Sequence, residues 1–200
     1  QRQMCIRDRV KEILKYLYKL RADNPDTGGY AYKAQTRDIA VVELLFATGI
    51  RVSELCELSC DAVDLKQATI KVFGKGSKER VIQICSVEVL KILRQYQRLF
   101  APSKCFFINR LGNRLSSQSV RLLIKRCREE IGIGKKITPH TFRHTFATLL
   151  LEEDVDIKYI QNLLGHSSIT TTQIYTHVNM NKQKKILSSK HPRKKMEMEE

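Results

Sequence analysis

Tryptophan is absent from this 200-residue chain, and aromatic residues of all kinds make up only 7% of it. Proteins that hold single-stranded nucleic acid by stacking its bases need exposed aromatic rings, so this composition is better suited to contact with duplex phosphates. Long apolar runs are also missing, and the N-terminus carries no secretory signal pattern. We therefore expect a globular protein of the cytoplasm with no membrane partner.

A cysteine framework is missing as well, although the chain contains six cysteines. None of them forms a CxxC pair, and Cys56 and Cys60, four positions apart, lie where Cys56 belongs to an apolar helical pattern. Disulfide-rich secreted domains and zinc-binding domains use closely spaced, paired cysteines. We therefore expect reduced thiols, and we prefer that interpretation to a structural zinc site.

Positive charge is what the chain has in excess. Its 36 lysines and arginines outnumber 21 acidic residues, which gives a formal net charge of +15. Seven of these cations lie in a C-terminal tail: Lys182, Lys184, Lys185, Lys190, Arg193, Lys194 and Lys195. The tail alone does not account for the excess, because the remaining basic residues are spread along the chain. Such a charge favours a polyanion as partner, most simply nucleic acid.

Hydrophobic periodicity predicts a mostly helical protein. Helices are expected at residues 8–21, 37–48, 51–58, 87–99, 116–131, 140–153, 156–164 and 179–188. Strands are expected at residues 69–73, 80–84 and 105–109. The sum is a single domain over residues 1–200 that is mainly α with a small three-stranded antiparallel sheet. We expect residues 1–8 to be non-native or disordered, and residues 179–200 to form a last helix and a basic tail.

The first candidate for chemistry is the stretch ATGIRVSEL, in which Arg51 follows a glycine turn at the start of a predicted helix. Backbone N–H groups at a helix start, the positive helix end and a guanidinium together suit an anion. Glu54, one turn further on, is placed to orient the arginine. Taken alone, the stretch is better explained as a surface Arg–Glu pair, which is common and weak.

The second candidate is FGKGSKER, the turn between the first two predicted strands. Lys75 stands between Gly74 and Gly76, and glycines allow close backbone approach and positive φ angles. A lysine in such a turn can be held over a phosphate. In isolation, a solvated basic turn explains the stretch better.

The third candidate is TPHTFRHTFATLL, which combines two histidines and an arginine with apolar residues. At about 100° per residue, a helix places His140, Arg143 and His144 on one face. Phe142 and Phe146 then lie on the opposite face. The apolar residues are therefore expected in the core, and the polar set is expected to point to one place.

Two ligands compete for this polar set, a metal ion and a phosphate. The His140/His144 spacing would suit zinc, but the metalloprotease pattern needs a glutamate directly after the first histidine, where Thr141 stands. Arg143, between the two histidines, would also repel a cation. We therefore favour the phosphate and expect no metal.

The fourth candidate is LLGHSSITTTQIYTHV, where Gly165 is expected to end a helix and His166 follows it directly. Tyr175 comes after a run of serine and threonine suited to touching a phosphate. Alone, Tyr175 would most often be a half-buried core residue.

Each stretch is weak evidence by itself, but together they supply two arginines, a lysine, two or three histidines and a tyrosine. This set suits one chemistry in particular. A tyrosine attacks a phosphodiester while a cage of cations holds its two non-bridging oxygens.

In order and spacing, the four stretches resemble the catalytic domain of the tyrosine recombinases, also called the phage integrase family. LLFATGIRVSELCEL, GKGSKERVIQI, TPHTFRHTFATLL and LLGHSSITTTQIYTHV are most similar to its Xer-like bacterial branch, as is the final HPRKK. The resemblance covers residues 37–193 and implies the fold of that catalytic domain. It also implies a site-specific DNA recombinase or integrase that cleaves and rejoins strands through a 3′-phosphotyrosine, with neither metal nor ATP as cofactor.

The resemblance implies a role for each residue that matches a family motif. Tyr175 would be the nucleophile, and Arg51 and Arg143 would clamp the scissile phosphate. Glu54 matches a supporting acidic position, and His144 matches a position that is usually structural.

Three further roles concern proton transfer and the phosphate. Lys75 would be the general acid for the leaving 5′ oxygen, and His140 would assist proton transfer. His166 would bond a phosphate oxygen.

The partners implied by the resemblance are double-stranded DNA and further copies of the chain, joined in a tetramer through the C-terminal helix. Family members carry a separate N-terminal DNA-binding domain, which we expect to be absent here because only some 36 residues precede the match. Two alternatives share the same residues: a type IB topoisomerase-like relaxing activity, and a DNA-binding fragment that is inactive alone. We expect the protein to act in the cytoplasm at the nucleoid.

Overall fold

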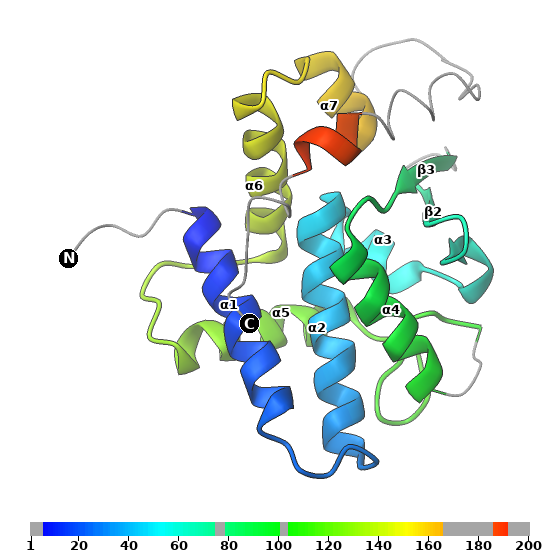
Figure 1. Cartoon of the computed structure of the whole chain (residues 1–200), viewed down its shortest axis with the longest axis vertical. Coiled ribbons are helices and arrows are strands. Elements are labelled where there is room, and N and C mark those ends of the chain that lie inside the picture. The colour runs from blue at the N-terminus through cyan, green and yellow to red at the C-terminus, as the bar shows by residue number, and fades with distance from the viewer. Residues whose placement is uncertain (1–5, 75–78, 101–103, 166–185, 192–200) are drawn as a thin grey trace.

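The computed structural model describes residues 6–74, 79–100, 104–165 and 186–191, which Figure 1 shows as coloured ribbon. Its α-helices are α1 (Ile6–Ala22), α2 (Tyr30–Thr48), α3 (Val52–Glu57), α4 (Val87–Leu99), α5 (Ser117–Glu130), α6 (Pro139–Glu152) and α7 (Ile157–Leu164). A short 3₁₀ helix, η1 (Cys60–Ala62), precedes the strands β1 (Val63–Asp64), β2 (Thr69–Phe73) and β3 (Glu79–Gln83). Residues 186–190 are also helical. The predicted fold class, mainly α with a three-stranded antiparallel sheet, is confirmed.

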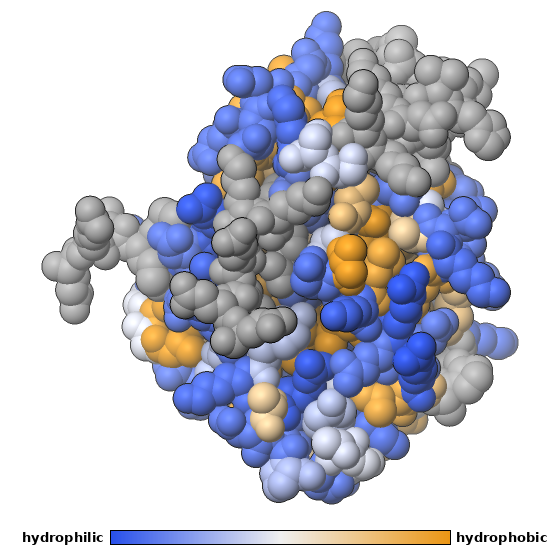
Figure 2. All heavy atoms as spheres, in the orientation of Figure 1, coloured by the Kyte–Doolittle hydropathy of each residue, from blue (hydrophilic) through white to orange (hydrophobic). Residues whose placement is uncertain are grey.

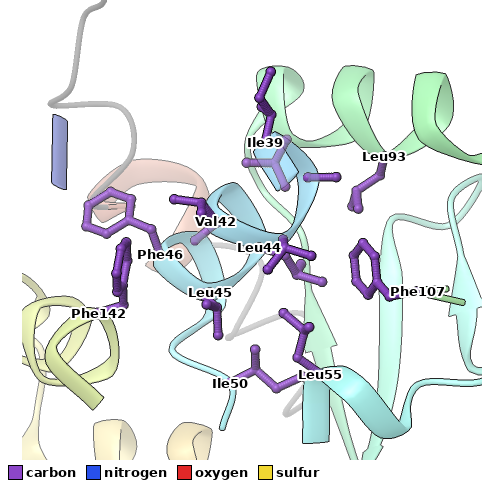
Figure 3. Packing of buried hydrophobic residues seen from close by; sticks show 14 of the residues in the cluster. Ile39, Val42, Leu44, Leu45, Phe46, Ile50, Leu55, Leu93, Phe107 and Phe142 are labelled. Atoms are coloured by element: carbon purple, nitrogen blue, oxygen red, sulfur yellow. The ribbon is translucent and has the colours of Figure 1, made fainter. Parts of the chain in front are cut away.

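Helix α2 is the centre of the fold and packs against α1, α4 and α6 (Figure 1). Every residue from Asp38 to Thr48 is buried, as expected for a helix that is apolar on nearly all faces. Figure 3 shows Phe46 of α2 beside Phe142 of α6, with Phe107 on the other side of the helix. The helix begins at Tyr30, earlier than the predicted residue 37. Its first turns are partly exposed and lack an apolar pattern, so hydrophobic periodicity did not indicate them.

The sheet has the strand order β1–β2–β3, with both pairs antiparallel. Ile70 of β2 is paired with Val63 on one side and Ile82 on the other. The prediction of the third strand at residues 105–109 is wrong, because that place is taken by the two-residue strand β1.

The middle of this segment, residues 106–108, is buried without forming a strand. Phe106 and Phe107 are both buried although they are adjacent, whereas successive side chains of a strand point to opposite faces. The hydroxyl of Tyr96 donates to the Phe106 carbonyl at 2.9 Å and accepts from the Ile108 N–H at 3.1 Å. Tyr96 therefore bonds two backbone groups of a segment whose β-pairing, among the described residues, is limited to the isolated bridges Ser59–Cys105 and Ile108–Arg114.

A second, smaller cluster of buried side chains joins α6, α7 and the helical residues 186–190. Leu187 is buried in this cluster, and the ring of His191 lies edge-on to Phe146 with 6.3 Å between ring centroids. Nε2 of His191 is 2.8 Å from the carbonyl oxygen of Ala47, near the end of α2. The segment 186–191 therefore packs on its own chain, and the rest of the predicted last helix lies outside the described residues.

Polar and charged side chains cover most of the face shown in Figure 2, with small apolar areas between them. None of the helices in the described ranges is long and apolar enough to cross a lipid bilayer. The five cysteines of these ranges form no disulfide with one another.

Candidate active site

Arg51 lies between α2 and α3, where Gly49 allows the chain to turn sharply from one helix into the next. Gly49 ends α2 in the left-handed region with φ of 60°, and a Cβ at this position would lie 2.7 Å from side-chain atoms of both Leu164 and Phe146. Only glycine satisfies both the backbone angle and the close approach. Because Arg51 follows two residues later as the N-cap of α3, this turn sets its direction.

The side chain of Arg51 is held by two groups. Nη1 donates to Oε1 of Glu54 at 2.9 Å, and Nη2 donates to the carbonyl of Gly165 at 3.0 Å. The backbone N–H of Arg51 donates to Oε2 of Glu54, so this N–H is not directed at an anion as we expected from the helix start. The side chain of Arg51 is 39% exposed, so solvent and ligands can reach it.

Glu54 is buried, with its side chain only 5% exposed, so the alternative of a surface Arg–Glu pair does not hold. Arg80 of β3 binds it through two parallel hydrogen bonds of 2.8 Å each. Burial alone would raise the pKa of Glu54, but hydrogen bonds from Arg80 and Arg51 outweigh it and lower this pKa to about 2. The carboxylate is therefore charged at neutral pH.

Sequence reasoning missed Arg80, which it placed in a strand without assigning a function. The available signal was strand alternation, because Arg80 and Ile82 are buried while Val81 between them is partly exposed. An arginine on the buried face of a strand needs an anionic partner.

Helix α6 begins at Pro139, one residue before the predicted start at residue 140. Thr138 is the N-cap and accepts a hydrogen bond from the backbone of Thr141, while Pro139 occupies the first helical position. Threonine at the cap and proline next to it are both favoured at a helix start. This start places Arg143 one turn into the helix.

Arg143 is buried between the ends of two other helices. Nη1 donates to the carbonyl of Gly49 at 2.8 Å, and Nη2 donates to the carbonyl of Leu164 at 2.7 Å. Burial and the nearby charges of Arg51 and Arg80 lower the pKa of Arg143 to about 10, against the opposite effect of Glu54. The guanidinium therefore stays protonated at neutral pH.

The two histidines of the same helix differ from Arg143 in their surroundings. His140 and His144 are exposed, whereas Phe142 and Phe146 are buried as predicted. The polar set therefore divides into a buried arginine and two histidines at the surface. Within the described ranges, no three His, Cys, Asp or Glu side chains are grouped so that they could hold a metal ion.

Lys75, His166 and Tyr175 lie outside the described residues. Two of them adjoin residues that the structure does describe. Lys75 follows Gly74 in the sequence, and His166 follows Gly165, whose carbonyl binds Arg51.

Arg51 and Arg143 meet at one place, because they donate to the consecutive carbonyls of Gly165 and Leu164. A guanidinium carries five N–H donors, so these bonds do not exhaust either side chain. The charge of Arg51 helps to lower the pKa of Arg143, which is the mark of two like charges held close together. An anion with two oxygens, such as a phosphodiester, would relieve this repulsion and accept hydrogen bonds from both arginines.

The comparison with known proteins agrees with this arrangement. The model of the phage integrase family matches residues 8–182, a range that contains both arginines and most of the chain. The chain belongs to the phage integrase family.

Among relatives of the phage integrase family, a tyrosine recombinase of Agathobacter rectalis is 51% identical over 189 residues, which cover 92% of this chain and 61% of the relative. The crystal structure of XerA recombinase matches with 33% identity and a TM-score of 0.68, over 91% of this chain and 62% of that one. XerH recombinase bound to its difH substrate, in a post-cleavage complex, matches with 24% identity and a TM-score of 0.68, over 90% of this chain and 51% of that one. The chain thus spans about three fifths of the curated relative.

Proposed function

We propose that this chain carries the catalytic site of a site-specific DNA recombinase or integrase. It cleaves and rejoins DNA strands through a 3′-phosphotyrosine intermediate, in which Tyr175 is the nucleophile. The observation that supports this proposal best is the meeting of Arg51 and Arg143, whose guanidiniums are anchored on consecutive carbonyls.

The two arginines take the role of the phosphate clamp. Attack on the phosphorus builds negative charge on the non-bridging oxygens, and planar guanidiniums meet two oxygens at once. Donors that are fixed beforehand contribute roughly 2.7–4 kcal/mol each to the transition state, by analogy with an oxyanion-hole donor. Arg51 and Arg143 are fixed in this sense, since each is held by two groups of the protein.

Three other residues complete the proposed chemistry. Lys75 protonates the leaving 5′ oxygen, because a lysine among other cations loses its proton more readily. His140 assists proton transfer, and His166 bonds a phosphate oxygen. A tyrosine with an ordinary pKa near ~10 needs this help at neutral pH.

The phosphotyrosine link keeps the phosphate as an ester, so religation needs no ATP. The arginines supply the charge that metal ions provide in other phosphoryl-transfer enzymes. We therefore propose that the reaction requires neither a metal ion nor a nucleotide cofactor.

Double-stranded DNA is the proposed substrate. The net charge of +15 and the DNA-bound state of the similar XerH structure support it. We further propose that four copies assemble on DNA through the C-terminal helix, and that the protein acts in the cytoplasm at the nucleoid.

A nicked suicide substrate tests the proposal, because loss of a short strand after cleavage traps the enzyme on DNA. We expect a covalent protein–DNA adduct with the wild-type chain and none with Tyr175→Phe. An adduct of equal yield with Tyr175→Phe would refute the assignment of the nucleophile. Relaxation of supercoiled DNA without pairing of two sites would indicate the topoisomerase-like alternative.

A further inference from the structure

Arg80 enters the site from β3, with its side chain only 6% exposed. Its two terminal nitrogens meet the two oxygens of Glu54 at 2.8 Å each, which is the fork geometry of an arginine on a carboxylate. Lysine cannot form this pair of parallel bonds. The contact therefore fixes both the position and the rotation of the Glu54 carboxylate.

The same carboxylate holds Arg51. Oε1 of Glu54 accepts from Nη1 of Arg80 and from Nη1 of Arg51, at 2.8 and 2.9 Å. Oε2 accepts from Nη2 of Arg80 and from the backbone N–H of Arg51, again at 2.8 and 2.9 Å. A displacement of the carboxylate would therefore move the side chain of Arg51 and the start of α3 together.

Arg80 also packs against the turn that follows α7. Gly165 has φ of 68°, and a Cβ at this position would lie 3.0 Å from Nη1 of Arg80. The carbonyl of Gly165 is the second group that holds Arg51. Arg80 thus binds Glu54 and lies close to Gly165, the two residues that hold the Arg51 guanidinium.

Stability alone accounts poorly for this ion pair. A buried pair contributes little more than packed apolar residues of similar volume, because both charges must lose their water. The Nε atom of Arg80 adds a further cost, since it is buried and has no hydrogen-bond partner among the described residues. What the pair provides is a defined geometry around Arg51.

We propose that Arg80 is a positioning residue for Arg51, acting through the Glu54 carboxylate and the Gly165 turn. This inference rests on the function proposed above, in which Arg51 clamps the scissile phosphate. Arg80 sets the direction of that clamp and takes no part in proton transfer.

Two variants separate the two parallel hydrogen bonds of Arg80 from its charge. Arg80→Met removes both the bonds and the charge, and Arg80→Lys keeps only the charge. Arg37→Met is the matched control, because it removes another largely buried arginine, paired with Asp38 at 2.8 Å outside the site. Cleavage of the nicked substrate is measured in a single turnover at saturating DNA, together with the Kd for DNA and the melting temperature. These three quantities distinguish positioning from binding and from folding.

We expect both Arg80 variants to cleave about 100-fold more slowly, the size of effect that a misplaced group produces, with little change in Kd. Arg37→Met should retain the wild-type cleavage rate even if its melting temperature falls by as much as that of Arg80→Met. An Arg80→Met rate within about twofold of wild type would overturn the inference.

A double-mutant cycle tests the route through Glu54. Because Arg80 acts through this carboxylate, adding Arg80→Met to Glu54→Gln should slow cleavage by no more than about threefold further. If the two effects multiply in full, the proposed route is wrong.

Binding of inorganic phosphate, followed by its effect on the melting temperature, gives a readout that needs no catalysis. Arg80→Met and Arg51→Lys should each weaken phosphate binding by about tenfold, and Arg37→Met should leave it unchanged. Unaltered phosphate binding in Arg80→Met would contradict the positioning role. Absence of any wild-type adduct would refute strand cleavage instead, and the phosphate titration would still decide the role of Arg80.

Discussion

Arg143 donates a hydrogen bond of 2.8 Å to the carbonyl of Gly49, a residue 94 positions earlier in the chain. The bond joins α6 to the end of α2, two residues before Arg51. Arg143 is thus part of the fold as well as of the candidate site, and its replacement should affect both stability and chemistry.

Replacement of Arg143 by alanine leaves the buried carbonyls of Gly49 and Leu164 without this donor. We expect the free energy of unfolding to fall by about 2–6 kcal/mol, since each of the two unsatisfied buried polar groups costs about 1–3 kcal/mol. Urea unfolding measures the change. His144→Ala, at an exposed position of the same helix, should change stability by no more than about 0.5 kcal/mol. Equal losses in the two variants would show that the carbonyl bonds are not what Arg143 contributes.

Glycine at position 49 is required for two separate reasons, which two alanine variants can distinguish. Gly132 has a similar φ of 69° but open space around it, so Gly132→Ala should cost only about 1 kcal/mol of backbone strain. Gly49→Ala adds a clash with Leu164 and Phe146 and should cost about 1–3 kcal/mol more, as overpacking of a core does. Thermal or urea unfolding of both variants provides the comparison. Similar losses would mean that the backbone angle alone requires the glycine.

The low pKa of Glu54 makes stability depend on pH in the acid range. Its folded pKa of about 2 lies below the ordinary value of 4.5, so the unfolded chain binds this proton first. The stabilisation is present in full above about pH 4.5 and is lost as the pH falls toward 2, a total of about 3 kcal/mol.

Comparison with Glu54→Gln isolates this contribution, because other carboxyl groups titrate alike in both proteins. The difference in unfolding free energy between wild type and variant should shrink by about 2 kcal/mol between pH 6 and pH 3. A constant difference over this range would mean that the pKa of Glu54 is close to its ordinary value in the folded protein.

Binding of duplex DNA by this chain should be weak and strongly dependent on salt. The net charge of +15 implies contacts to many phosphates, and each contact releases counterions from the DNA. A gel-shift titration should show the logarithm of the affinity falling linearly with the logarithm of the salt concentration. Tight binding that is insensitive to salt would exclude a mainly electrostatic interface.

Much of the fold followed from local patterns. The spacing of Val10, Ile13, Leu14 and Leu17 predicted α1, and the apolar residues of 37–48 predicted a buried central helix. The prediction of a strand at residues 105–109 was wrong, because an apolar run indicates that a segment is buried but not what it pairs with. The hydroxyl of Tyr96 in α4 forms hydrogen bonds with two backbone groups of that segment, and no pattern within the segment itself indicates this.

The candidate site was likewise predicted only in part, because local motifs identify residues but not their contacts with distant parts of the chain. Arg51, Glu54 and Arg143 stand in recognisable motifs, and the structure brings them together. Arg80 lies in one of these motifs too, yet its function became visible only through its contact with Glu54, 26 residues away.

The sequence by itself indicated the class of chemistry that we propose, because the positions of residues within one helix or turn depend only on local geometry. The excess of positive charge and the glycine turns at 49 and 165 belong to this level. Tertiary structure alone decided that Arg143 is buried while its neighbours His140 and His144 are exposed, and that one carboxylate holds two arginines. These relationships join residues from separate helices and strands, so no local pattern in the sequence contains them.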